Sequence, residues 1–160
     1  TPVKPKGFND LLEVKPITSE DDWAVIPSVH YNPASNSSRE SQLGFMKKRL
    51  ESFRMLSDQG VGHRFRAYLD GSLVGDLGVY YENDVGRFNE VATHHEYYRQ
   101  GICQTLVYLS SLYAIQQFGV SKLVIVADDF YHAINAYKNV GFKEDMLICL
   151  NSLQRFYSVY

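Results

Sequence analysis

Hydrophobic and polar residues alternate along three consecutive stretches in the middle of the chain. Apolar side chains recur at every second position in 64–69, and the stretches 73–81 and 87–93 have similar patterns. Such alternation predicts half-buried strands. The dipeptide Asp70-Gly71 separates the first two stretches and is typical of a tight hairpin turn. The pattern therefore predicts an antiparallel meander of three strands over residues 64–93.

Apolar residues spaced three or four positions apart predict helices on both sides of this meander. One such stripe precedes it, behind the capping-box signature Ser37-x-x-Glu40, and another follows Gly101. The two stripes are Leu43, Met46, Leu50 and Phe53, and Ile102, Leu106, Leu109 and Tyr113. We expect helices at about 20–29 behind a Thr18 or Ser19 cap, at 40–57, after Gly101, and at 130–139.

The second half of the chain adds a buried strand. Residues 122–127 read LVIVA behind a lysine, and an unbroken apolar run of this kind favours a strand covered on both faces. A strand, a helix and a buried strand in succession imply one parallel pair. Residues 11–17 are expected to form an edge strand, since Pro16 lacks a backbone donor, and 146–150 with 155–160 a final antiparallel pair. The predicted fold class is α+β: a mixed, mostly antiparallel sheet with helices on both faces.

Composition excludes several functional classes. The chain has 160 residues and a formal net charge of −2 without clustered basic residues, so no nucleic-acid partner is expected. No apolar run reaches membrane-spanning length, so no membrane partner is expected either. Its two cysteines, Cys103 and Cys149, have no zinc spacing and provide no disulfide framework, which favours a cytoplasmic location and no metal site. We interpret residues 1–10 as a leader or linker and 11–160 as a single domain.

The stretch Val91–Val107 carries the strongest chemical signal. It reads as the end of a strand, a turn and the start of a helix, with Gly101 at the helix entrance and Arg99 beside it. The first amides of a helix have no internal partners, and the positive end of the helix dipole faces the same way. A glycine there lets ligand atoms approach the backbone. The stretch therefore predicts a binding site for a diphosphate.

Two blocks resemble the Gcn5-related N-acetyltransferases (GNAT). Residues 98–103, YRQGIC, resemble the acyl-CoA-binding motif Arg/Gln-x-x-Gly-x-Gly/Ala, with Tyr98 and Cys103 at the two positions that differ. Residues 130–142 resemble the Asn-x-x-Ala-x-x-x-Tyr-x-x-x-Gly-Phe helix and its exit. There Ala133, Tyr137, Gly141 and Phe142 match, whereas Phe130 replaces the usual Asn.

The resemblance implies a GNAT-like acyl-CoA N-acyltransferase fold that moves an acetyl group from acetyl-CoA to a primary amine. It places the pantetheine arm in a gap beside the strand 87–93, where Ala92 and Thr93 would pair with it. The pyrophosphate would be bound by the segment after that strand. Its residues are Tyr98, Arg99, Gln100, Gly101, Ile102 and Cys103. Tyr137 takes the position of a general acid for the departing thiolate, which a phenol protonated at neutral pH can serve.

The general base is open between several residues. Glu90 lies near the expected strand separation and could deprotonate an ammonium directly or through water, and His94 or His95 at the strand end are alternatives. Cys103 is read either as a thiolate nucleophile or as a small residue tolerated where Ala is common. Asp128 and Asp129 are read as helix caps or as polar groups that replace the missing Asn.

The acceptor and the assembly are less specified by the sequence. Trp23, Tyr31 and the first two helices are expected to line the acceptor side, and the acceptor is a small-molecule or peptide amine. The aromatic strand 155–160 could extend the sheet across a homodimer. A second hypothesis is a catalytically inactive acyl-CoA-binding regulatory module. A dinucleotide-binding oxidoreductase is poorly supported, because the chain has no GxGxxG motif.

Overall fold

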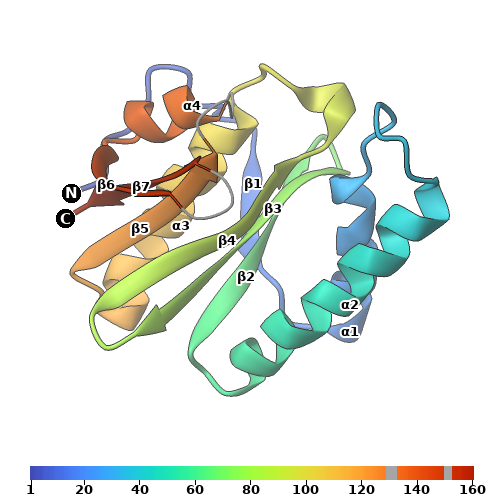
Figure 1. Cartoon of the computed structure of the whole chain (residues 1–160), viewed down its shortest axis with the longest axis horizontal. Helices are drawn as coiled ribbons and strands as arrows, with labels where there is room; N and C mark the ends of the chain where they lie inside the picture. The colour runs from blue at the N-terminus through green and yellow to red at the C-terminus, as the bar shows by residue number, and fades with distance from the viewer. Residues whose placement is uncertain (129–132, 150–152) are drawn as a thin grey trace.

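The computed structural model describes residues 1–128, 133–149 and 153–160. Its strands are β1 (Glu13–Pro16), β2 (Gly62–Leu69), β3 (Ser72–Glu82), β4 (Val85–Thr93), β5 (Lys122–Asp128), β6 (Lys143–Cys149) and β7 (Leu153–Val159). They form one sheet in the order β1-β2-β3-β4-β5-β7-β6 (Figure 1). Neighbouring strands are antiparallel except for the parallel pair β4 and β5.

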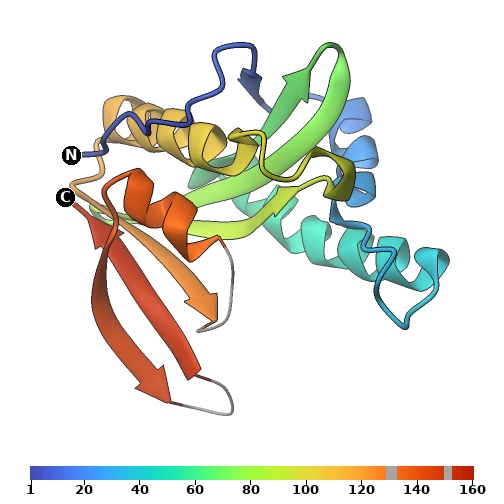
Figure 2. The same ribbon diagram turned by 90° about the horizontal axis from the view of Figure 1, so that it is seen from above.

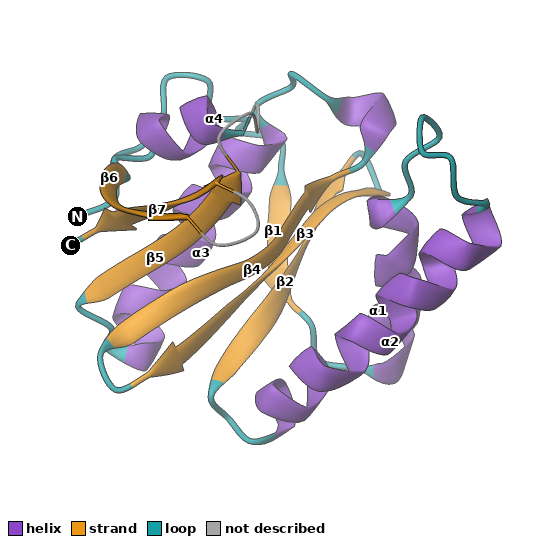
Figure 3. Cartoon of the chain, viewed as in Figure 1, coloured by secondary structure: helices purple, strands orange, loops and turns teal. Residues whose placement is uncertain are grey.

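Helices cover both faces of this sheet. They are α1 (Glu20–Val25), η1 (Ile26–His30, a 3₁₀ helix), α2 (Arg39–Asp58), η2 (His95–Tyr97, also 3₁₀), α3 (Ile102–Phe118) and α4 (Ile134–Asn139). The pair α1 and α2 lies on one face, and α3 and α4 lie on the other (Figures 2 and 3). Among the described segments, no helix combines the length and the apolar character that a membrane crossing requires. The arrangement confirms the predicted α+β class with a mixed, mostly antiparallel sheet.

The tight turn between β2 and β3 confirms the expected hairpin. Asp70 and Gly71 both have positive φ, 49° and 77°, as the central residues of a type I′ turn require. This turn matches the right-handed twist of the flanking strands, so it fixes their register. The predicted meander is therefore present as β2, β3 and β4.

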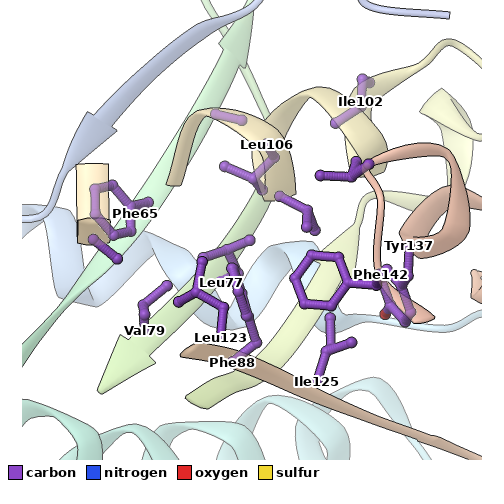
Figure 4. Close-up of a cluster of buried hydrophobic side chains, with 14 of the residues drawn as sticks. Phe65, Leu77, Val79, Phe88, Ile102, Leu106, Leu123, Ile125, Tyr137 and Phe142 are labelled. Carbon is purple, nitrogen blue, oxygen red and sulfur yellow. The ribbon is translucent and has the colours of Figure 1, made fainter. Parts of the chain in front are cut away.

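The main hydrophobic core lies between the sheet and α3. Figure 4 shows its central side chains: Phe65, Leu77, Val79, Phe88, Ile102, Leu106, Leu123, Ile125, Tyr137 and Phe142. A smaller cluster of Ile17, Ile26, Met46 and Leu50 fills the opposite face under α1 and α2. Apolar side chains are therefore buried between the sheet and the helices on each of its two faces.

Several boundaries differ from the sequence-based expectation. The cap of α2 is Ser38 instead of Ser37, and its hydroxyl accepts from the Ser41 amide. The first helix ends at Val25 and continues as a 3₁₀ turn, since Pro27 cannot donate a helical hydrogen bond. The helix expected from Phe130 is described from Ile134 onward, and Phe130 itself lies outside the described residues.

The final strand pair also differs. The strand expected at 146–150 already begins at Lys143, and its partner β7 lies between β5 and β6. Both sides of β7 are therefore hydrogen-bonded within the chain. The strand 155–160 is not a free edge, so the expected route to a homodimer through it is wrong. The exposed edges of the described sheet are β1 and β6.

The first residues of the chain, expected to form a leader or linker, lie along α3 and α4. The Val3 amide donates to the Val140 carbonyl at 2.8 Å. Asn9 donates from its amide to Thr105 Oγ1 at 2.8 Å and from its side chain to the Gln100 carbonyl at 3.0 Å. This segment therefore contacts the helix entrance that the sequence identifies as a diphosphate site.

Candidate active site

The strands β4 and β5 separate after three paired residues. Val85, Gly86 and Arg87 pair with β5, and the remainder of β4 has no strand partner on that side among the described residues. Residues 88–93 therefore present an unpaired edge of backbone amides and carbonyls. An extended ligand arm can add to such an edge as a further strand would. The gap lies where the resemblance implied it.

A β-bulge in β4 lies at the mouth of this gap. Glu90 and Val91 together face the single residue Leu77 of β3, because the pairing shifts between Asp76 and Gly78. Glu90 has φ = +50°, which is uncommon for a residue with a side chain and stores backbone strain. Bulges redirect the side chains and the hydrogen-bonding groups of a strand. The carboxylate of Glu90 is 21% exposed and forms an ion pair with Arg49 of α2.

A pocket of about 1090 Å³ joins the open edge of β4 to the entrance of α3. Its wall consists of the end of β4, the turn before α3, the segment around η1, and α4. Of the predicted site residues, those in its lining are Glu90, Ala92, Thr93, Tyr98, Arg99, Gly101, Ile102 and Cys103. Gln100 is not part of the lining, and its carbonyl accepts the Asn9 side chain instead. The structure thus brings together residues that the sequence places in two separate elements.

The entrance to α3 depends on backbone that only glycine adopts easily. Gly101 caps the helix with φ = +76°, and a Cβ built on it would collide with the carbonyl oxygen of Gly7. Arg99, two residues earlier, also has a positive φ of 63°. The two left-handed residues turn the chain into α3, and the first amides of a helix have no internal partners. Amides at a helix entrance of this kind can bind an anion.

Two buried polar atoms in the pocket wall have no hydrogen-bond partner within the described parts of the chain. They are Thr93 Oγ1 at the end of β4 and His95 Nδ1 in η2. Buried polar groups in folded proteins are nearly always satisfied, so unsatisfied ones at a pocket indicate a polar ligand.

Cys103 lies in the first turn of α3 and lines the pocket. Burial of its thiol raises the pKa to about 12, above its ordinary value. A neutral thiol is a poor nucleophile, because the thiolate is the reactive form. The chemistry of the thiol therefore supports a packing role and disfavours a covalent acyl-enzyme.

Tyr137 lies deeper than a pocket residue. Its side chain is 2% exposed and packs in the main core near Phe142 (Figure 4). It does not belong to the pocket lining, although its neighbours Ala133 and Ala136 on the same side of α4 do. Its role as general acid stays a prediction from the sequence.

The two histidines at the end of β4 differ in their surroundings. His94 stacks on His95 with ring centroids 4.5 Å apart, and its Nδ1 accepts the amide of Glu96. Desolvation, followed by the nearby His95, lowers the pKa of His94, with Glu96 opposing. His94 is therefore neutral at physiological pH and caps η2. Of the aspartates considered beside the pantetheine, Asp129 lies outside the described residues, and the side chain of Asp128 is not described either.

Sequence reasoning missed a buried charge network beside the bulge. Arg64 of β2 and Asp76 of β3 are both 0% exposed and form an ion pair, and His30 of η1 contacts the same carboxylate. The available signal was Asp76, a charged residue inside the otherwise apolar stretch 73–81. Buried charges are rare unless they are paired. The sequence pattern around Asp76 shows that it needs a partner, but it does not identify Arg64 or His30 as that partner.

Comparisons with solved structures return acetyltransferases over nearly the whole chain. The PaiA N-acetyltransferase of Thermoplasma acidophilum, in complex with coenzyme A, is 16% identical, with a TM-score of 0.73 over 92% of this chain and 97% of that one. The spermidine N-acetyltransferase of Vibrio cholerae, in complex with CoA and spermine, is 14% identical, with 0.71 over 94% and 96%. The ribosomal-protein-S5-alanine acetyltransferase of Vibrio fischeri is 13% identical, with 0.70 over 94% and 93%. At such identities these structures establish the fold.

The family follows from the sequence itself. No curated protein matches the chain, but residues 30–142 match the model of the acetyltransferase (GNAT) family. The matched range contains the β4–β5 separation, the α3 entrance and Tyr137. This chain belongs to the acetyltransferase (GNAT) family.

Proposed function

We propose that the chain is an acetyl-CoA-dependent N-acetyltransferase that moves an acetyl group to a primary amine by direct attack in a ternary complex. The observation that carries this proposal is the meeting of an unpaired strand edge with a helix entrance in one pocket. The edge suits an extended amide-bearing arm, and the entrance suits a diphosphate. Coenzyme A contains both groups in that order.

The donor side holds its ligand mainly with backbone groups. Ala92 and Thr93 offer the unpaired edge of β4, and the amides of Ile102 and Cys103 face the diphosphate. The guanidinium of Arg99 adds the only full positive charge among the predicted residues of this motif. Thr93 Oγ1, which is buried and has no hydrogen-bond partner among the described residues, gains one from the arm.

The reaction requires a neutral amine beside the thioester carbonyl and a proton for the departing thiolate. We assign the acid to Tyr137, since Ala136 of α4 and its N-cap Ala133 line the pocket and the phenol belongs to the same helix. The proposed function requires a general base on this side of the pocket, and the sequence-based candidates are Glu90 at the bulge and His94 or His95 after it. The acceptor is a small-molecule or peptide amine, in keeping with relatives that acetylate spermidine and ribosomal-protein alanine.

The decisive experiment measures thiol release from acetyl-CoA with a panel of amines for the wild type and for Tyr137→Phe. We expect kcat to fall by about a hundredfold, a typical contribution of general acid catalysis, without a change in CoA affinity. Phenylalanine keeps the ring that fills the core. The matched control is Tyr113→Phe in the aromatic cluster of α3, which should leave kcat unchanged. Equal kcat for Tyr137→Phe and wild type would contradict the assignment of the acid.

The burial of Tyr137 away from the pocket lining favours one alternative, an acyl-CoA-binding regulatory module without turnover. Such a module would bind CoA in calorimetry and release no thiol with any amine. If CoA produced neither heat nor saturation, both functions would be excluded.

A further inference from the structure

Three charged or titratable side chains form a buried network that ends at the pocket. Arg64 and Asp76 lie wholly inside the protein, and the side chain of His30 is 11% exposed. Two strands and η1 supply one residue each. Burying a pair of charges is costly and often contributes little net stability, so this network calls for a reason beyond holding the fold together.

The contacts give His30 a defined orientation. Its Nε2 lies 2.6 Å from Asp76 Oδ1 in an ion-pair contact, and that oxygen accepts no hydrogen bond within the described part of the chain. Two bare acceptors repel one another at this distance, so the contact is favourable when the ring carries a proton on Nε2. In the neutral ring the proton on Nε2 leaves the lone pair on Nδ1. Asp76 Oδ2 is meanwhile paired with Arg64, which fixes the carboxylate.

The ring also lies next to the bulge. Arg64 Nη2 is 3.4 Å from His30 Nε2 and donates to the Glu90 carbonyl at 3.3 Å, so one guanidinium nitrogen joins the histidine to β4. His30 and Glu90 both line the pocket. Nδ1 of His30 has no hydrogen-bond partner among the described residues, and the ring is only partly covered.

We propose that His30 is the general base of the transfer and that Asp76 is its positioning residue, an inference that rests on the proposed function. Nδ1 takes one proton from the ammonium, and the freed nitrogen pair attacks the thioester carbonyl carbon. A C–N bond forms, the tetrahedral intermediate collapses, and the C–S bond breaks. The second amine proton is lost as the thiolate gains one, and the imidazolium returns its proton to solvent. The amide, the free thiol and one proton balance the equation.

His30 is better placed for this role than Glu90, because the Glu90 carboxylate is already paired with the Arg49 guanidinium. Glu90 instead supplies negative charge that draws a cationic amine toward the bulge. The charged groups that contact the His30 ring are Arg64 from β2 and Asp76 from β3. Glu90 from β4, which pairs with Arg49 of α2, and His95 of η2, which contacts Tyr31, line the same pocket.

The first test compares the pH dependence of kcat/KM for the wild type, His30→Gln and Glu90→Gln. Imidazole accepts a proton near neutral pH and glutamine does not. We expect His30→Gln to lose about a hundredfold in kcat/KM and to lose the acidic limb of the profile, whereas Glu90→Gln keeps the limb. The matched control is His63→Gln, since His63 contacts Phe65, Tyr113 and Phe118, outside the pocket lining.

The second test separates catalysis from folding. Asp76→Asn should lower kcat less than His30→Gln and should shift the acidic limb, because the ring loses the group that orients it. Imidazole added to His30→Ala should restore part of the rate by occupying the vacated space. Calorimetry with CoA and thermal melting verify that each variant is folded and binds the donor.

The outcomes distinguish the two proposals. Wild-type turnover together with an unchanged rate and pH profile for His30→Gln overturns the role of His30 and leaves the proposed function intact. An unchanged limb in Asp76→Asn and no imidazole rescue overturn it as well. If the wild type turned over none of the amines, the proposed function would be overturned, and with it the role of His30 as general base.

Discussion

The two sides of the pocket present different chemical groups, which are backbone amides on one side and charged side chains on the other. The donor side, around the β4 edge and the α3 entrance, presents backbone amides, and its key residue has no side chain. The acceptor side, around η1 and the bulge, presents ionic side chains held by the buried pair of Arg64 and Asp76. Backbone recognition depends on chain geometry, whereas ionic recognition depends on which charges are paired. The two sides should therefore respond to different kinds of substitution.

The largest effect is expected on the acceptor side from Arg64→Met. It leaves Asp76 buried beside only His30, and removing one partner of a buried pair typically costs about 3–5 kcal/mol of unfolding free energy. Urea denaturation measures the loss. The control is Arg54→Met, which removes an exposed pair with Glu20 and should cost about 1 kcal/mol or less. Similar losses for both variants would show that burial does not set the sensitivity of the acceptor side.

The next effect is on the donor side, from Gly101→Ala. A left-handed alanine costs about 1–2 kcal/mol, and here the new Cβ also meets the Gly7 carbonyl. We expect CoA affinity to fall by about tenfold or more, which corresponds to 1.4 kcal/mol, in calorimetry. Gly119→Ala at the other end of α3 is the matched control, because Gly119 has φ = +67° with nothing within 4 Å. It should lower the melting temperature alone; weaker CoA binding by this variant would refute a specific role for the α3 entrance.

The smallest effect is expected from Cys103→Ala. Burial raises the pKa of the Cys103 thiol to about 12, so the group is protonated at neutral pH and alanine removes no charge. We expect kcat to be unchanged. In the wild type, alkylation of Cys103 should be slow at pH 7 and should accelerate as pH rises toward 12, because the thiolate fraction grows in that direction. Mass spectrometry of iodoacetamide-treated protein measures it, and rapid labelling at pH 7 would mean that the thiol is activated after all.

The sequence predicted those features whose causes are local. The turn at Asp70-Gly71 follows from two residues that tolerate positive φ, and the α3 entrance follows from Gly101 and the stripe behind it. The strand order β2-β3-β4-β5 followed from alternation, a tight turn and one buried apolar run. The donor side could therefore be outlined before any coordinates, although the roles of its residues remain predictions.

The acceptor side could not be predicted in the same way. The sequence separates the three residues of the network, His30, Arg64 and Asp76. The pattern around each of them does not indicate which other residues it contacts. Their meeting depends on how η1 packs over the sheet and on the register between β2 and β3, where Arg64 lies two residues along from the partner of Asp76. Likewise, the position of β7 inside the sheet depends on the long-range pairing of β5, which no pattern within 155–160 reveals.

The separation of β4 and β5 also bears on how this architecture tolerates divergence. An unpaired strand edge is a property of topology, and almost any residue supplies the same amide and carbonyl. Chains that share barely one residue in seven with this one nevertheless superpose over most of their length. The side chains along β4 can therefore change during evolution, while the backbone amides and carbonyls at its open edge stay the same.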